Sequence, residues 1–132
     1  MFQSDAARAY RILLVDDDLD TLEFQSEFLT RQGWDVERAS NGHEALALLL
    51  RAAPDVLVTD LNMPGMSGRA LCEAVRGMPA LGGIPILIIS GSDDARAVAT
   101  ACGANGVVKK PFDADRLVDE VRKLLPPASV LA

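Results

Sequence analysis

Short apolar runs alternate with helical stretches along almost the whole of this 132-residue chain. The runs are rich in β-branched residues and leucine, which is typical of strands buried on both faces. Strict alternation of strand and helix with short connections predicts an α/β fold, a doubly wound parallel sheet with helices on both faces. The expected strands are Ile12–Val15, Val36–Ala39, Val56–Val58, Ile84–Ile89 and Gly106–Val108.

Helix boundaries follow from glycine, proline and capping residues. A glycine that follows a helical stretch, or a proline pair, marks its end. The expected helices are Asp20–Gln32, His43–Ala53, Gly68–Arg76, Asp93–Cys102 and Asp113–Leu125. The length suits one domain. We therefore expect an N-terminal arm over residues 1–10, the domain over 11–125, and a tail or linker stub over 126–132.

Composition excludes several classes of function. The net charge of -6 opposes direct binding to the phosphates of nucleic acid. No apolar segment is long enough to span or anchor in a membrane. Cys72 and Cys102 stand in helical stretches without a metal-binding or disulfide spacing, so we expect reduced thiols and a cytoplasmic protein.

Polar side chains follow the buried strands at one edge of the expected sheet. Asp16 and Asp17 follow the first strand, Asp60 ends the third, Ser90 ends the fourth, and Lys110 follows the fifth. Crowded carboxylates repel one another unless a cation neutralises them, and Mg²⁺ prefers such oxygen ligands. An aspartate nucleophile, a lysine and a hydroxyl beside Mg²⁺ are sufficient for phosphoryl transfer.

The chain resembles the receiver domains of two-component response regulators, in the flavodoxin-like arrangement of the chemotaxis regulators. The resemblance covers about residues 11–125 and rests on the motifs ILLVDDD, DVLVTDLNMPGMSG, PILIISGS and GVVKKPF. It implies a (βα)5 sheet with strand order 2-1-3-4-5. It also implies a phosphoacceptor signalling switch rather than an enzyme, although the domain assists its own phosphorylation and dephosphorylation.

Residue roles follow from the same resemblance. Asp60 would take the phosphoryl group from a phosphohistidine on a histidine kinase or histidine phosphotransfer protein. Asp16, Asp17, Asp60 and the main-chain carbonyl of Asn62 would bind Mg²⁺. Ser90 and Lys110 would contact the phosphoryl oxygens, and the Lys110-Pro111 peptide bond would be cis. The downstream partner would be a protein, and the domain a monomer or a phosphorylation-dependent dimer.

Two positions bear on how the signal is passed on. The family usually has an aromatic residue at position 107, which acts with the hydroxyl of Ser90 as a switch, but here valine stands there. We therefore expect the readout to pass mainly through the loop after Ser90 and the fourth helix. In the first helix, Phe24 and Phe28 share a face, so we expect them in the core and Leu22 exposed as a partner contact.

Other interpretations remain open. The chain is either a stand-alone regulator or a receiver domain of a longer regulator or hybrid kinase. A degenerate receiver that only binds partners would normally lack an acid or the lysine, and none is missing. An aspartyl phosphatase would need a second carboxylate at position 62, and a nucleotide or flavin binder would need a glycine-rich loop after the first strand.

Overall fold

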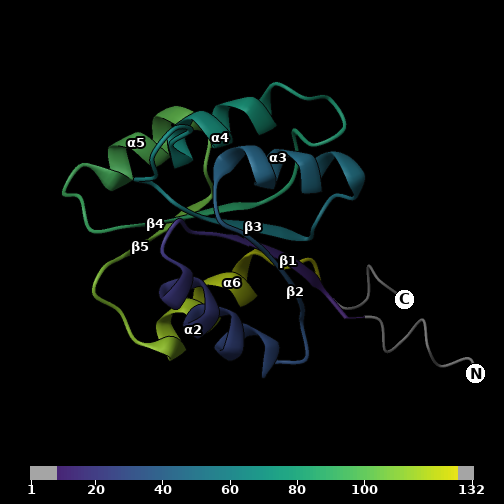
Figure 1. The fold of residues 1–132 in the computed structure, drawn as a ribbon, viewed down its shortest axis with the longest axis vertical. Helices are drawn as coiled ribbons and strands as arrows, with labels where there is room; N and C mark the ends of the chain where they lie inside the picture. The colour runs from purple at the N-terminus through teal and green to yellow at the C-terminus, as the bar shows by residue number, and fades with distance from the viewer. Residues whose placement is uncertain (1–8, 128–132) are drawn as a thin grey trace, which may run out of the picture.

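A five-stranded parallel sheet lies between two layers of helices (Figure 1). The computed structural model describes residues 9–127, and the expected arm and tail lie mostly outside this range. The strand order is β2-β1-β3-β4-β5, which confirms the expected topology. The strands are β1 (Arg11–Val15), β2 (Asp35–Ala39), β3 (Val56–Asp60), β4 (Ile86–Ser90) and β5 (Gly106–Lys109).

Helices cover both faces of the sheet in two layers (Figure 1). The first layer contains α3 (Gly42–Arg51), α4 (Gly68–Arg76) and α5 (Ala95–Cys102), and the second contains α2 (Leu19–Thr30) and α6 (Ala114–Leu124). Side-chain caps fix four of the five N-termini. The capping residues are Asp18, Asn41, Ser67 and Asp113.

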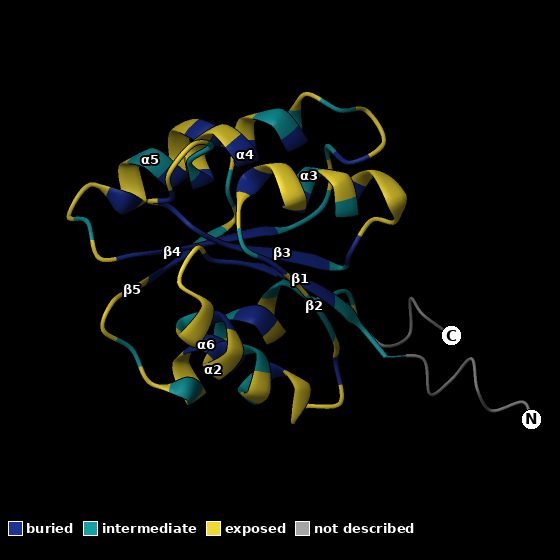
Figure 2. Ribbon diagram, viewed as in Figure 1, coloured by how far each residue is buried: buried dark blue, intermediate teal, exposed yellow. Residues whose placement is uncertain are grey.

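Each face of the sheet contributes to a separate apolar core, and Figure 2 shows that the inner strands β1, β3 and β4 are buried almost throughout. Successive side chains along a strand point to opposite faces. Leu13 of β1 therefore packs with the α3–α5 layer, whereas Leu14 packs with the α2–α6 layer. Every residue of β3 and β4 is buried, which holds the two strand ends that carry Asp60 and Ser90 in fixed positions.

The expectation for the first helix is wrong. Leu22 is 6% exposed and Phe24 is 61% exposed, while Phe28 is half-buried. Leu22 and Leu29 are about two turns apart, so they lie on the same side of α2. Both belong to the buried cluster that contains Leu117 of α6. The position of the sheet and α6 decides which face is buried, and the larger area of the phenyl rings does not.

Hydrogen bonds hold together the edge of the sheet at which the strands begin. The Arg76 guanidinium donates to the carbonyl oxygens of Gly82, Ile84 and Gly103 and to the Asn105 side chain. The Asn105 oxygen also accepts a hydrogen bond from the backbone N–H of the first residue of β4. Arg76 thus joins α4 to the segments that enter β4 and β5.

A second set of contacts secures the start of β1. The Arg11 guanidinium donates to Glu37 Oε1 and to the carbonyl of Ala53, and its backbone N–H donates to Asp55 Oδ2. The Tyr10 hydroxyl donates to the Pro126 carbonyl, so the two ends of the domain lie side by side. Within residues 9–127, no helix has the length and apolar character needed to cross a membrane.

Candidate phosphoacceptor site

The polar residues expected at the strand ends do meet at one edge of the sheet. Asp16 directly follows β1, Asp60 is the last residue of β3, and Ser90 is the last residue of β4. Lys110 follows β5, and its backbone N–H donates to the Ser90 carbonyl at 2.9 Å. Because the sheet is parallel, the carboxyl ends of these strands share one edge, which is where α/β sheets place their sites.

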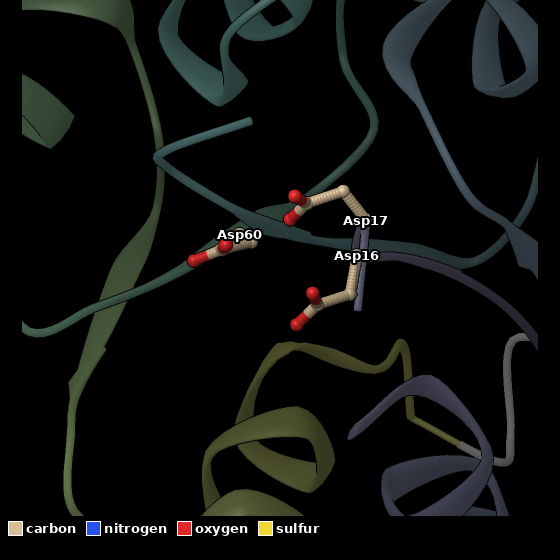
Figure 3. Close-up of side chains that lie close together, drawn as sticks. All are labelled: Asp16, Asp17 and Asp60. Atoms are coloured by element: carbon tan, nitrogen blue, oxygen red, sulfur yellow. The ribbon is translucent and has the colours of Figure 1, made fainter. Parts of the chain in front are cut away.

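Three carboxylates form the centre of the site (Figure 3). One oxygen from each of Asp16, Asp17 and Asp60 lies within 4.8 Å of the other two. Asp16 is 3% exposed and Asp60 is 6% exposed, whereas Asp17 is exposed. Burial raises the pKa of Asp60 above its usual range, against the opposing effect of the Lys110 ammonium. Burial also raises the pKa of Asp16, and the charge of Asp60 adds to this.

The raised pKa values of Asp16 and Asp60 indicate that their surroundings disfavour the charged carboxylates, chiefly because the two groups are buried. The Asp16 carboxylate accepts one hydrogen bond, from the backbone N–H of Asp18 at 2.9 Å. Asp18 itself faces the helix, where it caps α2 and accepts from the Thr21 hydroxyl, which lowers the pKa of its carboxyl. It is therefore a capping residue, as its place at a helix N-terminus indicates. The remaining three carboxylates fit a hard divalent cation, which takes oxygen ligands.

Two successive lysines point to different partners. Lys110 Nζ lies 3.4 Å from Asp60 Oδ1. Lys109 Nζ lies 2.9 Å from Asp93 Oδ1, in the loop after β4, and this contact lowers the pKa of Asp93. Alternation along the strand explains the separation. The Lys110-Pro111 peptide bond is cis, as expected from the resemblance.

Hydrogen bonds link the strand-four hydroxyl to the loop after it. Ser90 is fully buried, and its Oγ accepts from the Ser92 backbone N–H at 3.0 Å. The Ser92 hydroxyl in turn accepts from the Asn62 side chain at 3.3 Å. Asn62 is exposed, two residues beyond Asp60. The loops after β3 and β4 are therefore joined above the carboxylates.

The sequence places Gly68 at the start of a helix but does not indicate how closely it approaches Asp60. A Cβ atom at this position would lie 2.1 Å from the Asp60 carbonyl oxygen and 2.8 Å from the Leu61 Cα. The Gly68 N–H also donates to the Leu61 carbonyl at 2.8 Å. The first turn of α4 therefore packs directly on the backbone of Asp60. The glycine beyond Met63-Pro64-Gly65 is the only sequence signal of this approach.

Val107 lies in β5 and is 8% exposed. It belongs to the core cluster of the α3–α5 layer, which includes Ala95 and Ala99 of α5. A buried valine has no polar end that favours moving between the core and the solvent. The partner-contact role expected for Leu22 loses its basis, because this residue is buried in the opposite layer.

Comparison with known proteins agrees with this geometry. Residues 12–122 match the response regulator receiver domain family. Response regulator MprA of Mycobacterium leprae is 36% identical over 117 residues, which are 87% of this chain and 50% of that protein. Transcriptional regulatory protein TrcR of Mycobacterium tuberculosis is 35% identical over 92% of this chain and 47% of its own length. The chain thus spans about half the length of the curated relatives it matches.

Solved structures show the same relationship. Chemotaxis protein CheY4 of Vibrio cholerae has a TM-score of 0.84 and 33% identity, over 89% of this chain and 100% of that chain. A response regulator from Chloroflexus aurantiacus has a TM-score of 0.85 and 34% identity, over 89% and 98% of the two chains. With the strand order and the cluster of acids at the strand ends, these matches identify the chain as a member of the response regulator receiver domain family.

Proposed function

We propose that this domain is a phosphoacceptor switch and that Asp60 receives the phosphoryl group. The observation that carries the proposal is the position of the Asp60 carboxylate, which lies 3.4 Å from the Lys110 ammonium and clusters with the carboxylates of Asp16 and Asp17 within 4.8 Å. An aspartate so placed has both a counter-charge and a neighbouring set of metal ligands. Phosphoryl transfer depends mainly on such positioning and charge neutralisation.

The transfer involves one bond formed and one broken. An oxygen of the Asp60 carboxylate attacks the phosphorus of a phosphohistidine on a histidine kinase or histidine phosphotransfer protein. The new O–P bond replaces the N–P bond, and the released imidazole takes a proton from its surroundings. Lys110 then shifts from the carboxylate to the phosphoryl oxygens, and the Ser90 hydroxyl donates to one of them. The domain is itself modified by the reaction. We therefore class it as a phosphoacceptor that assists its own phosphorylation and dephosphorylation, and not as an enzyme.

Asp16, Asp17, Asp60 and the main-chain carbonyl of Asn62 are the proposed Mg²⁺ ligands. When bound, the ion supplies positive charge beside the phosphoryl oxygens and removes the repulsion among the carboxylates. The raised pKa values of Asp16 and Asp60 support this assignment, because burial disfavours their charged forms and a bound cation would compensate for the lost hydration.

We further propose that the signal leaves the domain through α5 and the loop before it. Asn62, Ser90 and Ser92 are joined by hydrogen bonds, so a movement of Ser90 toward a phosphoryl group changes the loop. Val107 stays in the core during this change. The output is a contact with a protein, with nucleic acid disfavoured by the net charge of -6. Phosphorylation-dependent dimerisation is one form that such a contact can take.

Whether the domain acts alone or within a longer regulator, and its cellular setting, are also part of this proposal. The chain spans about half the length of its curated relatives, and these include transcriptional regulatory proteins. A receiver domain that acts within a longer regulator is compatible with that finding. We retain a regulator that acts by protein contacts as the first choice. The two buried cysteines are free thiols, which supports a cytoplasmic setting.

The test is phosphorylation by acetyl phosphate, measured by intact mass. Wild-type protein with Mg²⁺ should gain the mass of one phosphoryl group, and Asp60→Asn should gain none. Removal of Mg²⁺ with a chelator should abolish the gain. An Asp35→Asn variant, which changes the exposed first residue of β2 at the opposite edge of the sheet from Asp60, is the matched control. A wild-type protein that stays unmodified would leave only a degenerate receiver that binds partners.

A further inference from the structure

A partly buried methionine packs against the start of a neighbouring helix. Met66 lies in the loop between β3 and α4 and contacts the core cluster of the α3–α5 layer. A Cβ atom at Gly42, the first residue of α3, would lie 2.8 Å from each of Met66 Cβ, Cγ and Sδ. Non-bonded carbon atoms in proteins prefer separations of about 3.5–4.0 Å. Any side chain at Gly42 would therefore displace Met66.

This contact explains why glycine stands at the start of α3. The φ angle of Gly42 lies outside the left-handed region, which among the glycines of residues 9–127 only Gly33, Gly65 and Gly103 adopt. Alanine would therefore adopt this backbone without strain, and it forms helices more readily than glycine. Because Met66 Cβ is bonded directly to the backbone, a change of rotamer alone would not relieve the overlap. The loop itself would have to move.

The loop that would move contains Asn62, whose carbonyl is the proposed main-chain ligand of Mg²⁺. The ends of the loop are held together, because the Gly68 N–H donates to the Leu61 carbonyl at 2.8 Å. Between these ends, Met63 is 8% exposed and belongs to the core cluster of the α3–α5 layer. Met66 packs against the same cluster. The loop therefore has two apolar anchors, one next to Asn62 and one on α3.

The segment before Gly42 is joined to the carboxylate cluster. The Asp16 N–H donates to the carbonyl of Ala39, the last residue of β2, at 3.1 Å. The Ser40 N–H donates to Glu44 Oε1 at 2.6 Å, which holds the first turn of α3 against the end of β2. The contact of Met66 with Gly42 therefore connects the loop that carries Asn62 to the segment that is bonded to Asp16.

We propose that Met66 is a positioning residue for the divalent-cation site and that Gly42 provides the space for its side chain. This role rests on the proposed function, in which the Asn62 carbonyl and the three carboxylates bind Mg²⁺. The Met66 side chain, held on the start of α3, fixes where the Asn62 main chain stands relative to the carboxylates. Mg²⁺ demands near-ideal octahedral geometry, so a fixed arrangement of its oxygen ligands favours binding.

The test is a double-mutant cycle on the affinity for Mg²⁺, measured by titration of the ¹⁵N-labelled full chain. Gly42→Ala and Met66→Ala should each raise the dissociation constant by about tenfold, an effect typical of removing a group that orients a metal ligand. The double variant Gly42→Ala/Met66→Ala should bind no more weakly than the weaker single variant, because both changes disrupt one contact. Met66→Leu keeps an apolar side chain of similar volume and should retain the wild-type affinity.

A matched control separates positioning from general packing. Met78→Ala removes another partly buried methionine that packs on the same core cluster, just after the end of α4. It should lower the midpoint of urea unfolding as Met66→Ala does, yet leave the Mg²⁺ dissociation constant unchanged. In the metal-free spectra, Met66→Ala should shift the backbone amides of Asn62 and Met63, whereas Met78→Ala should not. This comparison needs no bound metal.

Phosphorylation by acetyl phosphate gives a further readout. In Gly42→Ala and Met66→Ala, the Mg²⁺ concentration at half-maximal rate should rise by the same factor as the dissociation constant. The rate at saturating Mg²⁺ should stay near that of the wild type, because Asp60 and Lys110 are unchanged. A lower saturating rate with an unchanged half-maximal Mg²⁺ concentration would overturn the positioning role.

The outcomes distinguish this role from the proposed function. Wild-type Mg²⁺ affinity in both single variants, or losses that add in the double variant, would overturn the role of Met66 and leave the proposed function standing. A wild-type protein that binds no Mg²⁺ would overturn the proposed metal site and the role of Met66 together. A protein that binds Mg²⁺ but is not phosphorylated would contradict the proposed function, whereas the titration would still decide the role of Met66.

Discussion

The two edges of the sheet differ in how well their charged side chains are paired. At the edge where the strands begin, Arg76 reaches four acceptors and Arg11 pairs with Glu37. At the edge where they end, three carboxylates share a single lysine whose ammonium is 3.4 Å from Asp60. The first edge is complete without a ligand, and the second is not. A polar cluster that stabilises the fold thus differs from one that binds a ligand in how well its members satisfy one another.

The largest expected effect concerns packing at the carboxyl edge, which is electrostatically incomplete but sterically tight. Gly68→Ala should destabilise the domain by about 3 kcal/mol, because its Cβ meets backbone atoms that cannot move independently of Asp60. Phosphorylation by acetyl phosphate should fall together with the free energy of unfolding in urea. Gly83→Ala is the matched control, since a Cβ there meets nothing within 4 Å. A Gly68→Ala protein as stable as wild type would contradict the close approach.

The next test removes the central group of the amino edge. Arg76→Ala should lower the free energy of unfolding by about 2 kcal/mol, because four acceptors in the two segments that enter β4 and β5 lose a charged donor. Well below the unfolding temperature, the rate of Asp60 phosphorylation should stay at the wild-type level. Arg69→Ala removes only an exposed ion pair to Glu73 and should cost less than about 1 kcal/mol. A loss of phosphorylation without a loss of stability in Arg76→Ala would break the division between the two edges.

A smaller change in stability, of opposite sign, is expected for a substitution at the carboxyl edge. Folding raises the pKa of Asp16 and Asp60. The protonated carboxyl groups therefore increase the free energy of unfolding below about pH 4, and this contribution is lost as the pH rises through the folded pKa. At neutral pH without metal, Asp16→Asn should therefore raise the melting temperature. The asparagine oxygen can still accept the Asp18 N–H.

Added Mg²⁺ provides the complementary measurement. It should raise the melting temperature of the wild type by more than that of Asp16→Asn, because the variant has less repulsion to relieve and one ligand fewer. Asp17→Asn, at the exposed member of the cluster, should show a smaller change in metal-free stability. A metal-free Asp16→Asn protein that melts below the wild type would show that the charged Asp16 carboxylate does not destabilise the metal-free fold.

The smallest change in stability is expected when the ion pair between Lys109 and Asp93 is removed. This contact lowers the pKa of Asp93, so its contribution is present above the ordinary pKa and is lost as pH falls through the folded value. Both partners are exposed, so salt screens the pair. Asp93→Asn should shift the urea midpoint only slightly at neutral pH, and the shift should vanish in about 1 M salt. A shift that persists in high salt would indicate a role beyond this exposed pair.

The sheet and most of the site follow from local patterns in the sequence. The buried runs that become β3 and β4 end at Asp60 and Ser90, so parallel topology alone brings these residues together. The expected helix boundaries lie within two residues of those observed. α5 begins at Ala95 rather than Asp93; Asp94 is its N-cap without a side-chain hydrogen bond, and the Asp93 carboxylate pairs with Lys109.

The failures concern residues whose surroundings come from distant segments. Whether Leu22 or Phe24 enters the core depends on where α6 packs, which the pattern of α2 alone does not state. Gln25 is polar, so the pattern gives no reason to expect it in the buried stripe. The approach of Gly68 to Asp60 depends on the path of the loop between β3 and α4. Each of these positions depends on tertiary packing rather than on local periodicity.

The hydrogen bond from Tyr10 to Pro126 has a consequence for the topology of the polypeptide. It brings the beginning and end of the domain together at the edge remote from Asp60, so a short peptide could join them without crossing the site. New termini could then be opened at Gly83, where an added Cβ would meet no atom within 4 Å. Such a circularly permuted chain would keep all five strand ends in place. The order in which the strands are synthesised is therefore separable from the chemistry at their carboxyl ends.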